Sequence, residues 1–285
     1  MSRRGCRLPT APDRHSPKSC PARAYKPSPA ETGVARATTG KLEDTASPRY
    51  EVDSENYRWV SVHEWSYAEG ASFEVNIADP ETDFASHSIA QINLMGLNHD
   101  YSVELGWRAE AIGGPRIFTY VNKDDYQSHG LPGGSCYNCH FVPVPGAQYT
   151  PGQNLVPTAP PNNLITLKFG LREVAGNWWV WVGDQWIGYL EGSFWPEPFT
   201  VSERHSYYGE VYDPGPGVTD MGNGNWGYSN QASLMKNPDA ETFKNGQWHT
   251  RQETADRLWG LGDRYIGGNL SENGRNWKFG GPGTG

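Results

Sequence analysis

Two glutamates stand in strand-like segments and have the chemistry of an acid–base pair. Glu104 lies in Tyr-Ser-Val-Glu-Leu-Gly-Trp (101–107), and Glu210 lies in Tyr-Tyr-Gly-Glu-Val (207–211). Because side chains alternate along a strand, Glu210 shares a face with Tyr208. If the fold brings the two glutamates together among aromatic rings, burial can separate their pKa values, so that one acts as base and the other as acid. The alternative is two surface glutamates on half-exposed strands.

The composition of the chain predicts an all-β protein. Among 285 residues there are 34 Gly, 22 Pro, 12 Trp and 15 Tyr, which indicates many turns and many aromatic strands. Short alternating segments separated by turn signals are typical of an antiparallel sandwich or barrel. The sequence has no apolar run of the length that a transmembrane helix needs.

The elements that must position the glutamates are predicted from the alternation of apolar and polar residues. Strands are expected at 73–77, 89–97, 103–111, 116–122, 165–171, 178–182, 186–190 and 206–212. A Gly- and Pro-rich stretch at 129–163 is expected to form a long loop around a cysteine pair. Residues 213–238 also have loop composition, and 250–261 are predicted to form a short helix.

The first 49 residues differ in composition from the rest of the chain. They hold seven prolines and ten Lys/Arg against four Asp/Glu, so we expect a disordered basic segment that is dispensable for the fold. Residues 50–285 form the predicted folded domain. This domain has 14 Lys/Arg against 28 Asp/Glu, which argues against nucleic acid as a ligand. No apolar signal-peptide region follows the basic start, so these residues leave the compartment open.

One cysteine motif has the residue types of a haem-attachment or metal-binding site. Cys136-Tyr-Asn-Cys139-His140 matches the C-x-x-C-H pattern of haem attachment. It stands in a loop of a β-rich chain without a helical frame, which argues against haem. Cys136 and Cys139 are expected to form a short-range disulfide or to remain adjacent thiols. A zinc site needs two further ligands that the sequence does not place, so we expect no metal and no cofactor.

A dense aromatic segment, Asn-Trp-Trp-Val-Trp-Val (177–182), is followed by Trp186 and Tyr189. Alternation sends Trp179 to one face of this strand and Trp178 to the other. Such side chains either line a groove for a sugar or a peptide, or they form the core and an aromatic outer surface.

Taken in chain order, these segments resemble the neprosin family of glutamic peptidases. The resemblance covers about residues 57–283 and rests on an ordered set of short motifs. The main ones are Gly70-Ala-Ser-Phe73, Val-Glu-Leu-Gly-Trp107, Arg-Ile-Phe-Thr-Tyr120, Gly-Asn-Trp-Trp179, Ile-Gly-Tyr189, Gly-Glu-Val211, Thr-Asp-Met-Gly-Asn-Gly224 and Phe-Gly-Gly-Pro-Gly283.

The resemblance implies an antiparallel β-sandwich with a concave active-site groove. By motif, its two catalytic glutamates are Glu104 and Glu210, and we expect them on neighbouring strands of one concave face. The residues expected to contact a peptide or protein substrate are Trp107, Trp179, Tyr189 and Tyr208.

The activity implied by the resemblance is that of a secreted, monomeric glutamic endopeptidase that works at acid pH. The best-known members cut after proline. Leu105 and Tyr208 stand where the family usually has Ala and Gly, and these departures bear on that preference. Two rival functions remain. One is a non-catalytic aromatic-groove module that binds glycans or cell-wall polymer, and the other is a glycosidase, since two carboxylates and stacked Trp also suit sugar hydrolysis.

Overall fold

The computed structural model describes residues 56–96, 100–158, 165–215, 217–253, 259–260, 265–268 and 273–283. The predicted disordered segment 1–49 lies outside these residues. In the part of the chain that the structure describes, no helix has the length and apolar character needed to cross a membrane.

The described elements are almost all strands. The first sheet contains β1 (Tyr57–Ala68), β3 (His87–Met95), β4 (Ser102–Glu110), β5 (Arg116–Asn122), β6 (Cys136–Tyr137), β11 (Ser202–Tyr212) and β14 (Trp259–Gly260). The second contains β2 (Gly70–Asn76), β7 (Phe141–Pro143), β8 (Thr166–Val174), β9 (Asn177–Val182), β10 (Gln185–Leu190), β12 (Ser233–Lys244), β13 (Gln247–Gln252), β15 (Ile266–Gly267) and β16 (Asn276–Gly280).

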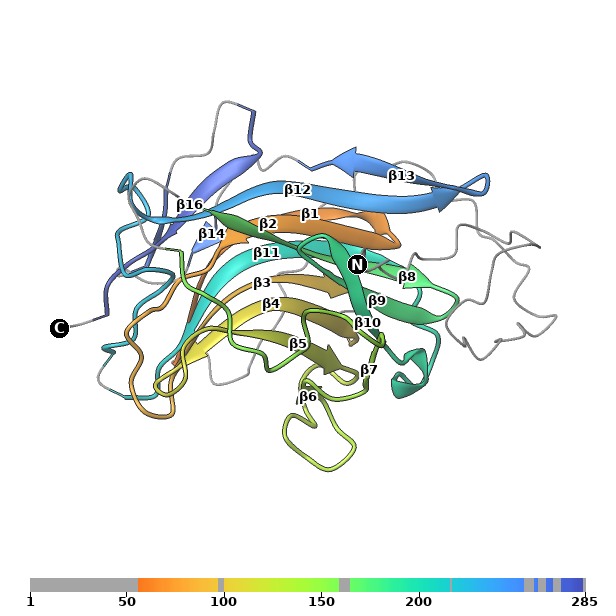
Figure 1. Ribbon diagram of the computed structural model, residues 1–285, viewed down its shortest axis with the longest axis horizontal. Coiled ribbons are helices and arrows are strands. Elements are labelled where there is room, and N and C mark those ends of the chain that lie inside the picture. Colours follow the sequence, from red (N-terminus) through yellow and green to blue (C-terminus); the bar gives the residue numbers. More distant parts are fainter. Residues whose placement is uncertain are drawn as a thin grey trace.

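Two antiparallel sheets form a sandwich (Figure 1). The seven-stranded sheet has the order β14-β1-β11-β3-β4-β5-β6, and the nine-stranded sheet has the order β15-β16-β12-β2-β8-β9-β10-β7, with β13 paired to β12. The predicted β-sandwich is therefore confirmed. Strands far apart in the chain are neighbours, since β1 pairs with β11 along most of its length.

The hydrophobic core fills the space between the sheets. Its largest fully buried side chains include Trp107, Trp178, Trp277, Tyr207, Phe73 and Phe169. Because alternate residues of a strand point to opposite faces, each core residue of β4 and β11 is flanked by residues on the outer face of the seven-stranded sheet. The core thereby fixes which side chains of these two strands face outward.

The structure corrects the predictions for the region after residue 212. The predicted loop 213–238 includes the start of β12, and the predicted helix at 250–261 is replaced, where described, by the end of β13 and by β14. Pro238 and several charged residues make the sequence of β12 look unlike a strand. The strand tolerates them at a bulge, where the register shifts between Lys236 and Asp239 and Asn237 has a φ of 53°.

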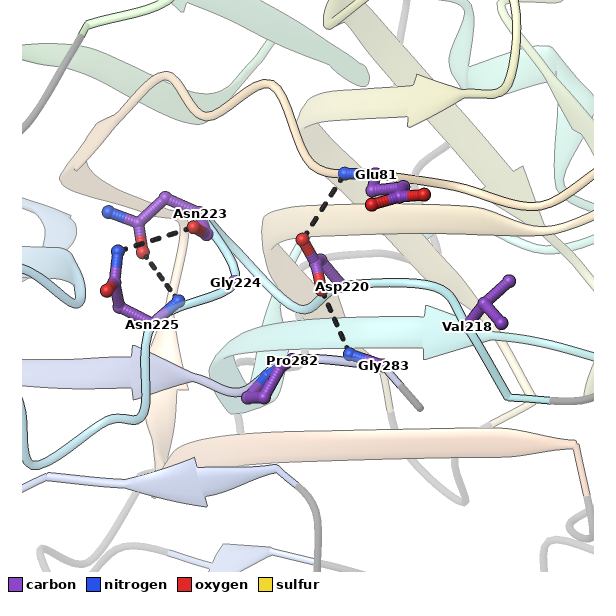
Figure 2. Close-up of a pocket in the computed structure, with 8 residues that line it drawn as sticks. All are labelled: Glu81, Val218, Asp220, Asn223, Gly224, Asn225, Pro282 and Gly283. Carbon is purple, nitrogen blue, oxygen red and sulfur yellow. Dashed lines mark hydrogen bonds between the residues drawn. The ribbon is translucent and has the colours of Figure 1, made fainter. Parts of the chain in front are cut away.

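Asp220 ties together three segments that are distant in the chain. Its Oδ1 accepts a hydrogen bond from the backbone N–H of Gly283 at 2.9 Å, and its Oδ2 accepts one from Glu81 at 3.4 Å. Figure 2 shows Asp220 between these two residues on the wall of a hollow of about 390 Å³. Both carboxylate oxygens are committed to backbone donors, so this hollow marks a structural junction.

Candidate active site

Glu104 and Glu210 lie on one face of the seven-stranded sheet. The register pairs Glu104 with Asn93 and Glu210 with Ile89, and these two partners are four residues apart on β3. Since directly paired residues share a face, and residues an even number apart on a strand also do, both glutamates point to the outer face. The prediction of neighbouring strands was wrong, because β3 runs between β4 and β11.

We call this surface the glutamate face and define it by Gln91, Asn93, Glu104, Arg108, Tyr208 and Glu210. Tyr208, Gln91 and Gly106 form the row of paired residues between the levels of the two glutamates. A Cβ at Gly106 would lie 2.0 Å from the carbonyl oxygen of Ala90, so only glycine allows β4 to lie this close to β3. The surface between the two glutamates therefore carries no side chain at position 106.

The Glu104 carboxyl is buried and held by hydrogen-bond donors. Its Oε1 accepts from the Tyr126 hydroxyl at 2.6 Å, from Asn93 Nδ2 at 3.2 Å and from Ser102 Oγ at 3.5 Å. Burial raises the pKa of Glu104 to about 7. The Tyr126 hydrogen bond acts against this rise, and the negative charge of Glu210 adds to it.

Glu210 has a different environment. Burial raises its pKa to about 7 as well, but the Arg108 guanidinium lowers it. Its Oε1 lies 3.4 Å from His87 Nε2. Burial lowers the pKa of His87 to about 3, so this contact is a hydrogen bond from a neutral ring and not a salt bridge above that pH. A cation thus favours the carboxylate of Glu210, whereas an anion disfavours that of Glu104.

Tyr126 was missed by the sequence analysis, because it comes from the loop after β5. Asp125 and Tyr126 have φ values of 52° and 63°, in the left-handed region that non-glycine residues rarely adopt. The backbone N–H of Tyr126 donates to Asn122 Oδ1 at 2.7 Å, which holds this turn. Strain of this kind clusters at functional sites. The polar turn residues after Asn122 predict a loop, but nothing in them indicates a contact with Glu104.

The predicted substrate-contact residues are dispersed. Tyr208 is on the glutamate face, with its hydroxyl 3.4 Å from Asn93 Nδ2. Trp107 instead lies on the core side of β4, fully buried, and its Nε1 donates to the carbonyl of Asn76 at 2.9 Å. Its predicted substrate contact is therefore corrected to a core position, which strand alternation from Glu104 already implies.

Trp179 and Tyr189 belong to the other sheet. They lie on β9 and β10 with ring centroids 5.1 Å apart. Because Trp178 and Val180 point into the core, the alternation of β9 directs Trp179 to the outer surface of the nine-stranded sheet. These two aromatic residues therefore do not share a surface with the glutamates.

Cys136 and Cys139 form a disulfide, one of the two predicted states. Cys136 is the first residue of β6, and the next residue, Tyr137, pairs with Tyr120 of β5, with ring centroids 4.6 Å apart. With His140, the cysteines are the one group of metal-ligand type found among the described residues. Since their sulfurs are bonded to each other, they are not available as thiolate ligands.

Comparisons with known proteins add a family and a structural similarity. The family model described as Neprosin matches residues 85–282, which include both glutamates. No curated protein matches the chain. The solved structures that match include the crystal structure of scytalido-glutamic peptidase with a peptide-based transition-state analogue. That match has 8% identity and a TM-score of 0.40, and it covers 80% of this chain and 98% of the other.

Proposed function

Because the chain belongs to the Neprosin family, we propose that it is a glutamic peptidase in which Glu104 and Glu210 hydrolyse peptide bonds. The observation that carries the proposal is the pair itself. The carboxyls of buried Glu104 and partly buried Glu210 lie on one face, both with pKa values raised to about 7, and their charged neighbours differ: Glu210 acts on Glu104, and Arg108 acts on Glu210. Pairs whose environments differ in this way suit acid–base chemistry.

In the proposed mechanism Glu210 is the base. The cation of Arg108 stabilises its carboxylate, so the first proton to leave the coupled pair comes from Glu210. The Glu210 carboxylate then removes a proton from a water molecule, while the water oxygen attacks the carbonyl carbon of the scissile bond.

Glu104 is the acid in this scheme. The charge of Glu210 helps to retain its proton. Since Tyr126, Asn93 and Ser102 all donate to Oε1, the proton is carried by Oε2. That O–H donates to the oxyanion formed by the attack, and the proton passes to the amine nitrogen as the C–N bond breaks. Proton exchange with water then returns the pair to its starting state.

The most direct test is digestion of a denatured protein at a series of pH values, with the cut sites mapped by mass spectrometry. We expect activity only while the pair carries one proton: it should fall above about pH 7, where Glu104 gives up its proton, and fall again in more acid solution, where Glu210 takes one up. The same maps show whether cuts follow proline, as the family resemblance implies. An absence of cleavage at every pH, from protein with a cooperative unfolding transition, contradicts the proposal.

Tyr126→Phe tests how the carboxyl of Glu104 is held. This change removes the 2.6 Å donor, and we expect kcat to fall by roughly tenfold with little change in KM, since one hydrogen bond that positions the acid is lost. The Tyr126 bond lowers the pKa of Glu104, so its loss raises that pKa and moves the alkaline limb of the kcat profile to higher pH. Tyr228→Phe, at an exposed tyrosine, is the control. If the pH profile of kcat is unchanged in folded Tyr126→Phe, Tyr126 does not position the Glu104 carboxyl.

The Trp-rich segment that suggested a glycan-binding module or a glycosidase lies elsewhere, since Trp179 and Tyr189 belong to the other sheet. The aromatic residues beside the glutamates are tyrosines, among them Tyr126 and Tyr208. A secreted, monomeric protein is also part of the proposal. The disulfide between Cys136 and Cys139 supports secretion, because disulfides persist in oxidising compartments.

A further inference from the structure

A small hollow of about 130 Å³ lies at the edge of the glutamate face, where β4 ends and β5 begins. Its walls include Arg108, Arg116, Glu110, Phe118 and Tyr137. Arg108 and Arg116 are direct partners across β4 and β5, so two guanidinium groups reach one small space. The aromatic rings supply an apolar wall beside them.

The charged groups in this wall leave a net positive charge. Arg108 Nη2 pairs with Glu110 Oε1 at 2.7 Å. Arg116 donates to two neutral acceptors, Asn154 Oδ1 and the carbonyl of Ile112, each at 3.1 Å. In the described part of the chain, Arg116 takes part in no ion pair. The cation of Arg116 is thus not matched by a carboxylate of the described residues.

Arg108 also offers a donor to an incoming group. Its Nε is buried and makes no hydrogen bond to any described residue. A buried guanidinium N–H is costly to leave unpaired, so this atom favours a ligand that brings an acceptor. The guanidinium carbon lies 4.2 Å from the centre of the Tyr137 ring, and this stacking fixes the plane of the fork.

The hollow is adjacent to the proposed reacting centre. Arg108 and Glu210 both pair with Ile89, from opposite sides of β3. Arg108 therefore takes part in both sites: it lies in the same row of the sheet as Glu210, and it also lines the hollow. A substrate bound over the glutamates would reach the hollow with a group close to the scissile bond.

We propose that this hollow is a substrate subsite for a carboxylate, supplied by an acidic side chain near the scissile bond or by the C-terminus of the substrate. The inference rests on the proposed peptidase function and names its substrate class. A planar carboxylate matches the fork of a guanidinium group, and the methylene carbons of Glu pack on Phe118 and Tyr137. Acidic residues near the cut then select substrates, in addition to any preference for proline.

Two sets of matched peptides separate the two sources of the carboxylate. In the first set Glu is placed in turn at each position around a cut site, and each peptide has a Gln counterpart. In the second set the peptides differ only in a free or an amidated C-terminus. We expect kcat/KM to favour the carboxylate member of at least one pair by roughly tenfold, which corresponds to about 1.4 kcal/mol. The preference should weaken at high salt.

Arg116→Gln is the decisive variant, because Arg116 is not part of the proposed catalytic machinery. It should cleave the neutral peptides as well as the wild type does and lose the preference for the carboxylate peptides. Arg116→Glu should prefer Lys over Glu at the same position. Lys168→Gln removes the same charge from an exposed residue of the nine-stranded sheet and should keep the wild-type preference.

The outcomes distinguish the subsite from the peptidase function. Equal cleavage of all pairs by the wild type, or an unchanged preference in Arg116→Gln, overturns the subsite and leaves the peptidase proposal standing. If no peptide is cleaved at all, the peptidase proposal fails, and calorimetric titration of the wild type and Arg116→Gln with the same peptides decides on the hollow. Binding that depends on both the carboxylate and Arg116 supports a carboxylate site, and the absence of such binding overturns it.

Discussion

Replacing either Glu104 or Glu210 by Gln is expected to abolish peptide-bond hydrolysis, with a loss in kcat on the order of 10²- to 10⁴-fold. Gln keeps the size of the side chain and can still accept hydrogen bonds, but it neither takes up nor releases a proton. Because the two carboxyls act as a unit, the double variant should be hardly worse than either single one. The measurement is cleavage of an unfolded, proline-containing protein at acid pH.

Stability provides the control for these two variants. Burial raises the folded-state pKa of each carboxyl to about 7, above the usual value of 4.5, so ionising either one destabilises the folded protein as the pH rises through this interval. Glu104→Gln and Glu210→Gln should therefore unfold at the same temperature as the wild type, or at a higher one, above pH 7. Full activity in either folded variant would exclude that residue from the mechanism.

The second large effect is expected for Glu253→Ala, which should lower the free energy of unfolding by about 3–5 kcal/mol. Glu253 is only 4% exposed. It accepts hydrogen bonds from His205 Nδ1 at 2.7 Å, from the Tyr207 hydroxyl and from Arg251 Nη2 at 3.1 Å. His205 and Tyr207 are fully buried, so truncating Glu253 leaves two polar groups in the core without this partner.

The contribution of Glu253 also depends on pH. Burial acts to raise its pKa, but His205, Tyr207 and Arg251 together outweigh burial, and the pKa is lowered. A lowered folded-state pKa means that the stabilisation is complete above the usual glutamate pKa and is lost as the pH falls through the lowered value. Urea unfolding of wild type and variant across pH 3–8 should show the difference shrinking in acid. Glu197→Ala, at an exposed glutamate, should change stability by less than about 0.5 kcal/mol. A similarly small change for Glu253→Ala would contradict the expectation.

Strand alternation predicted much of the sheet but not all of it. β5 and β9 were predicted nearly to the residue, because each is a short run of apolar and aromatic residues bounded by turn residues. β12 was missed, because its bulge allows a proline inside the strand. β13 was taken for part of a helix, since its short, exposed sequence has no apolar face and its structure depends on pairing with β12.

The candidate site was predictable only in part. The family resemblance predicted that Glu104 and Glu210 share a face, whereas their placement on β4 and β11, with β3 between them, depends on long-range pairing. Strand alternation places Arg108 on the face of Glu104, but its effect on Glu210 follows from the register of three strands. Tyr126 reaches Glu104 only through the geometry of a strained turn. Trp107 was assigned to the substrate by resemblance, although alternation alone placed it on the opposite face.

The alternation along β11 also matters for how this protein can change. Tyr208 and Glu210 face outward, whereas Tyr207 and Gly209 face the core, where a Cβ at Gly209 would lie 2.2 Å from the Phe279 ring. Along this one strand, the inward positions are constrained by core packing, whereas the outward positions face the proposed substrate site. The partly exposed outward positions Tyr208 and Tyr212 are open to changes that alter specificity, while the inward positions and the buried outward ones, such as Ser202 and Ser206, are held by packing. A directed-evolution library restricted to Tyr208 and Tyr212 would sample new substrate preferences at little cost in folding.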